Sequence, residues 1–128
     1  MRLLLDTHSF LWYVLNDSQL SATAESHISD PDNDVLVSAA VYWEIAIKVG
    51  NKKLDLKEPF DDFMDRGIRR NDFEVLPVEL RHASKLITLP FHHRDPFDRI
   101  LVAQALTDGL RVVSIDEKLD AYGVQRIW

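Results

Sequence analysis

Residues 2–6 read Arg2-Leu3-Leu4-Leu5-Asp6, three large aliphatic side chains in a row followed by an acid. Successive side chains of a strand point to opposite faces, so an unbroken aliphatic run predicts a strand buried on both faces, as in a parallel sheet covered by helices. The same pattern recurs in 34–38, Asp-Val-Leu-Val-Ser, and in 111–115, Arg-Val-Val-Ser-Ile, which Asp116 follows. These three segments predict the centre of a parallel sheet.

Segments with helical spacing separate the predicted strands. Helical spacing of apolar residues marks 8–16, 21–29, 39–49, 59–70, 79–87 and 97–108, while 73–76 and 124–127 are weaker strand candidates. Ser21 and Pro59 stand where helices should begin, and Gly50 and Gly109 stand where helices should end. Strands that alternate with helices predict a three-layer α/β/α sandwich around a central parallel sheet of about four to five strands.

Length and composition restrict the class of protein. The chain has 128 residues, 46% of them hydrophobic, which suits a single domain over 1–128 with a sizeable core. The absence of cysteine excludes disulfides, thiolate metal sites and a cysteine nucleophile. The N-terminal apolar run is too short for a signal peptide or a membrane span, so we expect a soluble, cytoplasmic protein without membrane contact. The net charge of −6 means that nucleic-acid binding would need local compensation, from metal ions or a partner's basic surface.

Two acids, Asp6 and Asp116, each follow the end of a predicted strand. In open parallel α/β sheets, ligands bind beyond the carboxyl ends of the strands, where helix N-termini and loops converge. An acid in this position is also a common cap of the following helix. Taken singly, each acid is explained equally well by capping and by a functional role.

Glu44 lies in an almost entirely apolar helical segment, 39–49. A carboxylate in such a helix costs free energy unless it is paired or bound to a metal. Lys48, four residues on, offers an ion pair in the favourable orientation, but an exposed pair of this kind contributes only about 0.3–0.5 kcal/mol. We therefore favour a functional role for Glu44.

A further cluster of charged residues runs from His92 to Arg99. Asp95 followed by Pro96 is typical of a helix N-cap with proline at the first helical position. Asp98 then falls in the first turn, where the helix dipole favours a carboxylate and the backbone holds it rigidly. Because Asp95 already has a capping role, we choose Asp98 as the site residue, with Asp95 in support.

Four acids from distant segments, Asp6, Glu44, Asp98 and Asp116, thus form the predicted catalytic and metal-binding set. Carboxylate oxygens suit Mg²⁺ or Mn²⁺, and the ion would offset their mutual repulsion. Such an ion can activate a water and neutralise charge that develops on a phosphodiester. Thr7 and Ser114 are placed to orient ligands or water. Lys48, Arg94 and Arg99 are candidates for contact with RNA phosphates.

These residues match a known family: the chain resembles the PIN domain, in particular the small VapC-type ribonuclease toxins of VapBC toxin–antitoxin pairs. The resemblance covers essentially the whole chain. Its marks are Leu3 to His8, Val37-Ser38-Ala39 leading to Trp43-Glu44-Ile45 with Lys48, His92 to Ala105, and Val113 to Asp116 with Tyr122-Gly123-Val124.

The resemblance implies a PIN-like fold, Mg²⁺-dependent endoribonuclease activity, a homodimer and a cognate antitoxin that occludes the site. It also implies that Asp6, Glu44 and Asp98 correspond to the family's invariant acids and Asp116 to a fourth, more variable one. The spacing from Asp98 to Ala103 and Ala105 supports Asp98 over Asp95.

Two rival hypotheses remain open from the sequence. The first is a non-catalytic, metal-binding regulatory or interaction domain of the α/β class, in which the acids hold a structural ion or cap helices. The second is a metal-dependent DNA nuclease or a small phosphatase. One large phosphatase class uses an Asp-x-Asp pair, which this chain lacks because position 8 is His.

Overall fold

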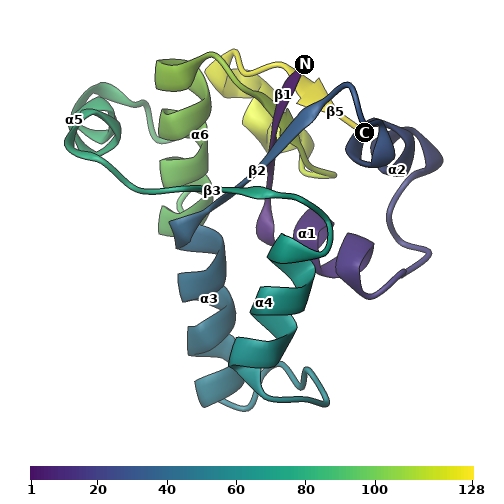
Figure 1. Ribbon diagram of the computed structural model, residues 1–128. Coiled ribbons are helices and arrows are strands. Elements are labelled where there is room, and N and C mark those ends of the chain that lie inside the picture. The colour runs from purple at the N-terminus through teal and green to yellow at the C-terminus, as the bar shows by residue number, and fades with distance from the viewer.

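The computed structural model describes residues 1–128 and contains one five-stranded sheet in the order β3-β2-β1-β4-β5. Every neighbouring pair of strands is parallel. Helices lie on both sides of the sheet (Figure 1). The predicted α/β/α sandwich with a parallel central sheet is confirmed.

The elements follow the predicted order along the chain. The strands are β1 (Arg2–Leu5), β2 (Asp34–Ser38), β3 (Glu74–Leu76), β4 (Arg111–Val113) and β5 (Arg126–Ile127). The helices are α1 (Thr7–Val14), α2 (Ala22–Ser29), α3 (Ala39–Gly50), α4 (Phe60–Arg69), α5 (Leu80–Thr88) and α6 (Pro96–Asp108), with a 3₁₀ helix, η1 (Glu117–Tyr122). No helix has the length and apolar character that a membrane span requires.

The aliphatic run of β1 forms the centre of the sheet. Leu3, Leu4 and Leu5 are fully buried, since β2 and β4 flank the strand and helices cover both of its faces. Leu4 lies in register with Leu36 of β2 and Val112 of β4. The main core contains 29 buried residues, to which all five strands contribute.

Helix boundaries agree with the local chemistry of the sequence. The Ser21 hydroxyl accepts a hydrogen bond from the Ala24 backbone and caps α2. Gly109 ends α6 in the left-handed conformation, at φ 68°, which glycine adopts without steric cost. Gly50 differs from the prediction, because it is the last residue of α3 and Asn51 is its C-cap.

The segment after β4 departs most from expectation. The predicted strand 111–115 ends at Val113, so Ser114 and Ile115 form a turn instead. The 3₁₀ helix η1, which the sequence analysis did not predict, follows this turn, and Asp116 caps it. As a result, Asp116 lies just beyond the sheet edge and not at the end of a longer strand.

The strand order reverses at β1, whose neighbours β2 and β4 lead into different layers. With right-handed crossovers, α1 to α4 cover one face of the sheet and α5, α6 and η1 cover the other. A crevice at the carboxyl ends of the strands is the standard ligand position at such a reversal. Asp6 ends β1, and α3 follows directly on β2, so this edge gathers the predicted site residues.

Candidate active site

Asp6 both caps α1 and faces the carboxyl edge of the sheet. Its Oδ1 accepts a hydrogen bond of 2.8 Å from the Ser9 backbone, while Oδ2 makes no hydrogen bond within the chain. The residue is 6% exposed. The Ser9 hydroxyl donates to the carbonyl of Val113, so α1 is tied to the end of β4. Asp6 therefore caps α1 with one carboxylate oxygen and keeps the other available for a ligand.

Glu44 is buried at 8% exposure and has a donor on each oxygen. The Thr7 hydroxyl donates to Oε1 over 2.5 Å, and the Lys48 ammonium lies 3.0 Å from Oε2. Thr7 thus orients a carboxylate, the kind of role predicted for it. The Lys48 pair also exists, with the lysine side chain one-third exposed, so Lys48 is engaged with Glu44 and not free at the rim.

Asp98 and Asp95 occupy the first turn of α6 but make different contacts. Asp95 Oδ1 accepts hydrogen bonds from the backbones of Phe97 and Asp98, as an N-cap does. Asp98 Oδ2 lies 3.3 Å from Nε2 of His93, and its Oδ1 has no hydrogen-bond partner within the chain. The geometry supports the choice of Asp98 over Asp95 as the acid that faces the site.

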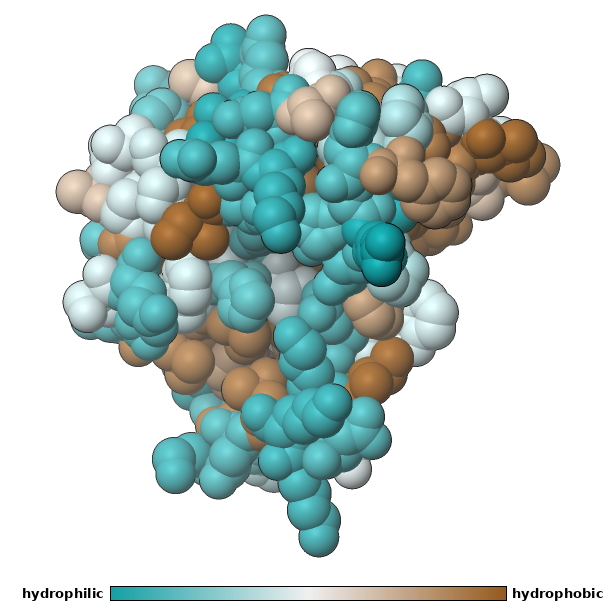
Figure 2. All heavy atoms as spheres, turned by 180° about the vertical axis from the view of Figure 1, so that it is seen from behind, coloured by the Kyte–Doolittle hydropathy of each residue, from teal (hydrophilic) through white to brown (hydrophobic).

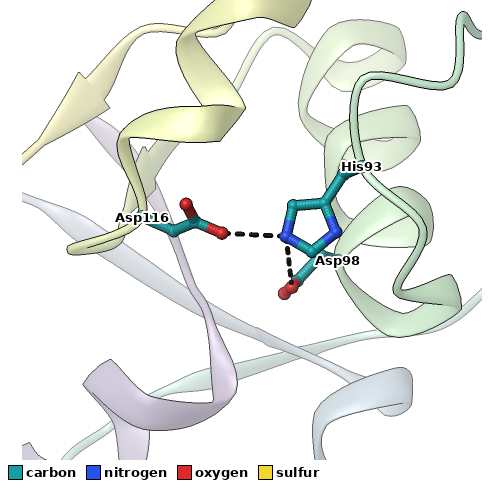
Figure 3. Close-up of side chains that lie close together, drawn as sticks. All are labelled: His93, Asp98 and Asp116. Carbon is teal, nitrogen blue, oxygen red and sulfur yellow. Dashed lines mark hydrogen bonds and ion pairs between the residues drawn. The ribbon is translucent and has the colours of Figure 1, made fainter.

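Asp116 reaches the same place from the turn after β4. Its Oδ1 accepts from the Lys118 backbone, and its Oδ2 lies 2.9 Å from Nε2 of His93. The fully buried Ser114 accepts a hydrogen bond from the Asp116 backbone and so shapes this turn. Figure 3 shows His93 between Asp98 and Asp116, with its Nε2 directed to both carboxylates.

His93 is not among the predicted site residues. Spacing along the sequence gives no reason to join its imidazole to Asp116, 23 residues away. The available signal is local: His93 lies two residues before the capping Asp95, whose backbone N–H donates to its Nδ1. Only the fold brings η1 against this loop.

Electrostatic repulsion within the cluster is visible at Asp98. The pKa of Asp98 is raised to about 7, chiefly by burial and also by the charges of Asp95, Asp6 and Glu44, while His93 acts in the opposite direction. An aspartate with this pKa holds a proton through much of the acid range. The charges of Asp6 and Glu44 therefore act on Asp98. Asp116 is linked to this group through His93, which contacts both Asp98 and Asp116.

The donor set fits a divalent ion with oxygen ligands. Asp6 Oδ2 and Asp98 Oδ1 both lack hydrogen-bond partners, and they come from the two sides of the carboxyl edge. His93, Asp98 and Asp116 also offer ligand atoms within 4.8 Å of one another. Hard oxygen donors suit Mg²⁺ and Mn²⁺. Two cavities of about 480 and 570 Å³ lie elsewhere, toward the amino ends of the strands, beside Arg2 and Asp34.

The structure does not place Arg99 on the surface, where the predicted RNA contact requires it. Arg99 is 7% exposed, and its guanidinium donates to the carbonyls of Leu89 and Pro90 and to the Tyr122 hydroxyl. The Phe91 ring covers the guanidinium at 4.0 Å. The Arg99 guanidinium is occupied by the backbone carbonyls of residues 89 and 90, because this side of α6 faces inward. Arg94 is exposed and stays a candidate.

The fold and the site define a class: parallel α/β proteins that gather acidic side chains beyond the carboxyl ends of their strands. The profile of the PIN-domain family matches residues 3–125. The chain belongs to the PIN-domain family.

Known proteins similar to the chain agree with this assignment. Ribonuclease VapC22 of Mycobacterium tuberculosis is 25% identical over 120 residues, which are 93% of this chain and 90% of that protein. The structure of VapBC2 from Rickettsia felis, bound to a DNA fragment from their promoter, has a TM-score of 0.74 at 14% identity, covering 98% of this chain and 97% of that one. M. tuberculosis VapC20, a Sarcin-Ricin loop cleaving toxin, has a TM-score of 0.64 at 17% identity, covering 95% of each chain.

Proposed function

We propose that the chain is a metal-dependent endoribonuclease, the toxin component of a VapBC-type toxin–antitoxin pair. The observation that carries the proposal is the convergence of acids from four distant segments: Asp6 and Glu44 act on the charge of Asp98, and His93 contacts both Asp98 and Asp116. The PIN-domain assignment and the similarity to ribonuclease VapC22 support RNA as the substrate. We further propose that 1–128 fold as one PIN-like domain around the shared core and act in the cytoplasm.

In this proposal Asp6, Glu44, Asp98 and Asp116 hold Mg²⁺ or Mn²⁺. When bound, such an ion polarises a water molecule for attack and stabilises negative charge on the phosphodiester. Asp6 and Asp98 supply the oxygens that make no hydrogen bond within the chain. Glu44 is oriented by Thr7 and Lys48, and Asp116 by the Ser114 turn. Arg94, exposed next to the capping Asp95, is the candidate contact to an RNA phosphate.

Replacing Asp98 by Asn tests the catalytic role. The change keeps the shape of the side chain and removes the charge, so Mg²⁺- or Mn²⁺-dependent cleavage of RNA should fall by more than the roughly 100-fold typical of losing an outer metal contact. The matched control is Asp65→Asn, an exposed acid on α4 that pairs with Arg69. Both variants and the wild type are assayed on an RNA pool and on single-stranded DNA, with metal and with EDTA.

The two rival functions give different results in this assay. Wild-type protein that binds Mn²⁺ but cuts no RNA in the pool would point to a regulatory domain. Cleavage of DNA in preference to RNA would point to a DNA nuclease. Cleavage of RNA by Asp98→Asn at the wild-type rate would remove the proposed site from the mechanism.

We also propose two protein partners, a second copy of the chain and a cognate antitoxin. Large apolar side chains are exposed on one region: Leu80 and Ile87 of α5 at 84% and 86%, and Phe91 at 82%. In Figure 2 an apolar patch projects on the side of the molecule where α5 lies. Such a patch is typical of a protein contact surface.

The solution mass of the purified chain tests the homodimer, and Leu80→Glu with Ile87→Glu should leave monomers. Co-expression with any short reading frame that neighbours the gene tests the antitoxin, whose product should co-purify and suppress cleavage. If the chain is monomeric at high concentration and no neighbouring product binds it, both partners are excluded from the proposal.

A further inference from the structure

His93 stands between two carboxylates that do not touch each other. Its Nε2 lies 2.9 Å from Asp116 Oδ2 and 3.3 Å from Asp98 Oδ2 (Figure 3). Asp98 belongs to α6 and Asp116 to the turn before η1, so the imidazole joins two separate elements. The side chain is only 15% exposed, which keeps it out of bulk solvent.

The other ring nitrogen determines where the proton lies. The backbone N–H of Asp95 donates to Nδ1 over 3.1 Å, so Nδ1 is an acceptor and carries no proton. A neutral imidazole has one N–H, which must then be on Nε2, facing the two carboxylates. A carboxylate accepts hydrogen bonds, and Nε2–H is the complementary donor.

A hydrogen-bond network centred on Tyr122 and Arg99 holds the backbone around His93. The His93 backbone N–H donates to the Tyr122 hydroxyl over 2.8 Å. The same hydroxyl accepts from the buried Arg99, which also holds the carbonyls of Leu89 and Pro90. The loop that carries His93 is therefore pinned to α6 and to η1, the two elements whose acids it contacts.

We propose that His93 is a positioning residue, which donates from Nε2 to Asp98 and Asp116 and so fixes the two carboxylates that would hold the metal. The inference rests on the proposed metal site. This role differs from that of a metal ligand. An imidazole that ligates through Nε2 carries its proton on Nδ1, and that proton would face the Asp95 N–H, which is itself a donor. His93 thus belongs to the support of the site, and Asp116 is oriented through it.

Three substitutions separate the donor from the rest of the side chain. His93→Gln places an amide N–H near the position of Nε2, whereas His93→Asn keeps an acceptor for the Asp95 N–H and has no donor at that distance. His93→Ala lacks both. His92→Ala, which removes the adjacent exposed imidazole, is the control.

Mn²⁺ affinity is measured by calorimetry without RNA, and nitrogen coupling to bound Mn²⁺ is measured by pulsed electron paramagnetic resonance. We expect affinity to fall about 10–100-fold in His93→Ala and His93→Asn and less than about tenfold in His93→Gln and His92→Ala. Wild type should show no coupling from a coordinated imidazole. Melting in EDTA identifies any variant that does not fold, and the Gln and Asn pair carries the test if Ala fails.

Two outcomes overturn the inference. Equal Mn²⁺ affinity in wild type, His93→Asn and His93→Ala would show that the donor has no positioning role. A nitrogen coupling in wild type that disappears in His93→Gln would make His93 a metal ligand. Neither outcome depends on RNA cleavage, so a failure of the proposed ribonuclease activity is recognised separately, by wild-type protein that binds Mn²⁺ and leaves RNA intact.

Discussion

At the scale of single residues, the carboxyl group of Asp98 shows the effect of burying an acid beside other acids. Its pKa is raised to about 7 from an ordinary value of 3.8, first by burial and then by the charges of Asp95, Asp6 and Glu44. Between these two pH values the folded protein holds a proton that the unfolded chain has released. The contribution of Asp98 to stability is therefore fully present below about pH 4 and is lost as the pH rises through about 7.

The pH dependence of melting checks this. Asp98→Asn has no charge to repel its neighbours, so in EDTA its melting temperature should gain on wild type as the pH rises from about 4 to about 7, by about 3–6 °C for each kcal/mol relieved. The control, Asp65→Asn, should show no such trend. A difference between Asp98→Asn and wild type that stays constant with pH would show that the acids do not repel one another.

At the scale of secondary-structure elements, α4 approaches α1 closely at one glycine. A Cβ on Gly67 would lie 3.0 Å from Cζ of Phe10 and 3.2 Å from Cγ2 of Val14. Phe10 is fully buried and packs against the rings of Phe63 and Phe73. Alanine favours a helix over glycine by about 1 kcal/mol, but overpacking of a core costs about 1–3 kcal/mol.

Gly67→Ala should therefore lower the free energy of unfolding by up to about 2 kcal/mol. Gly50→Ala is the matched control, because a Cβ on Gly50 meets nothing within 4 Å and the substitution should be neutral or stabilising. Urea denaturation of the two variants gives the comparison. If Gly67→Ala is as stable as Gly50→Ala, α1 and α4 do not pack as closely as described.

At the scale of the whole molecule, we expect a divalent ion bound at the proposed acidic site to affect folding. An ion that binds the folded chain and not the unfolded one stabilises it by about 2.7 kcal/mol at 100 times its dissociation constant. Saturating Mg²⁺ or Mn²⁺ should raise the melting temperature by about 8–16 °C, with a larger effect at pH 8 than at pH 6, because the ion competes with the Asp98 proton. NaCl at the same ionic strength is the control. An equal rise with NaCl would mean that general screening of the −6 charge, and not the site, is responsible.

Sequence patterns predicted the elements well and their chemistry in part. Aliphatic runs identified the three central strands, and the two weaker candidates became the edge strands β3 and β5. The cap at Asp95-Pro96 and the stop at Gly109 are confirmed. The prediction failed for η1, whose first residues have no apolar period, and for Arg99, which a pattern of charges cannot distinguish from a surface residue. In the folded chain Arg99 is enclosed by Leu89, Pro90 and Tyr122.

The sequence by itself determined that Leu3 to Leu5 form a buried central strand. Successive residues of a strand face opposite sides of the sheet, so three leucines in a row make both faces apolar. It also made Glu44 conspicuous, since a carboxylate among apolar neighbours is costly wherever the helix packs. Only the tertiary structure decided that His93 links Asp98 to Asp116 and that Arg99 faces inward. These contacts join the 89–95 loop to η1 and α6, and local physical rules do not determine which distant segments the sheet topology brings together.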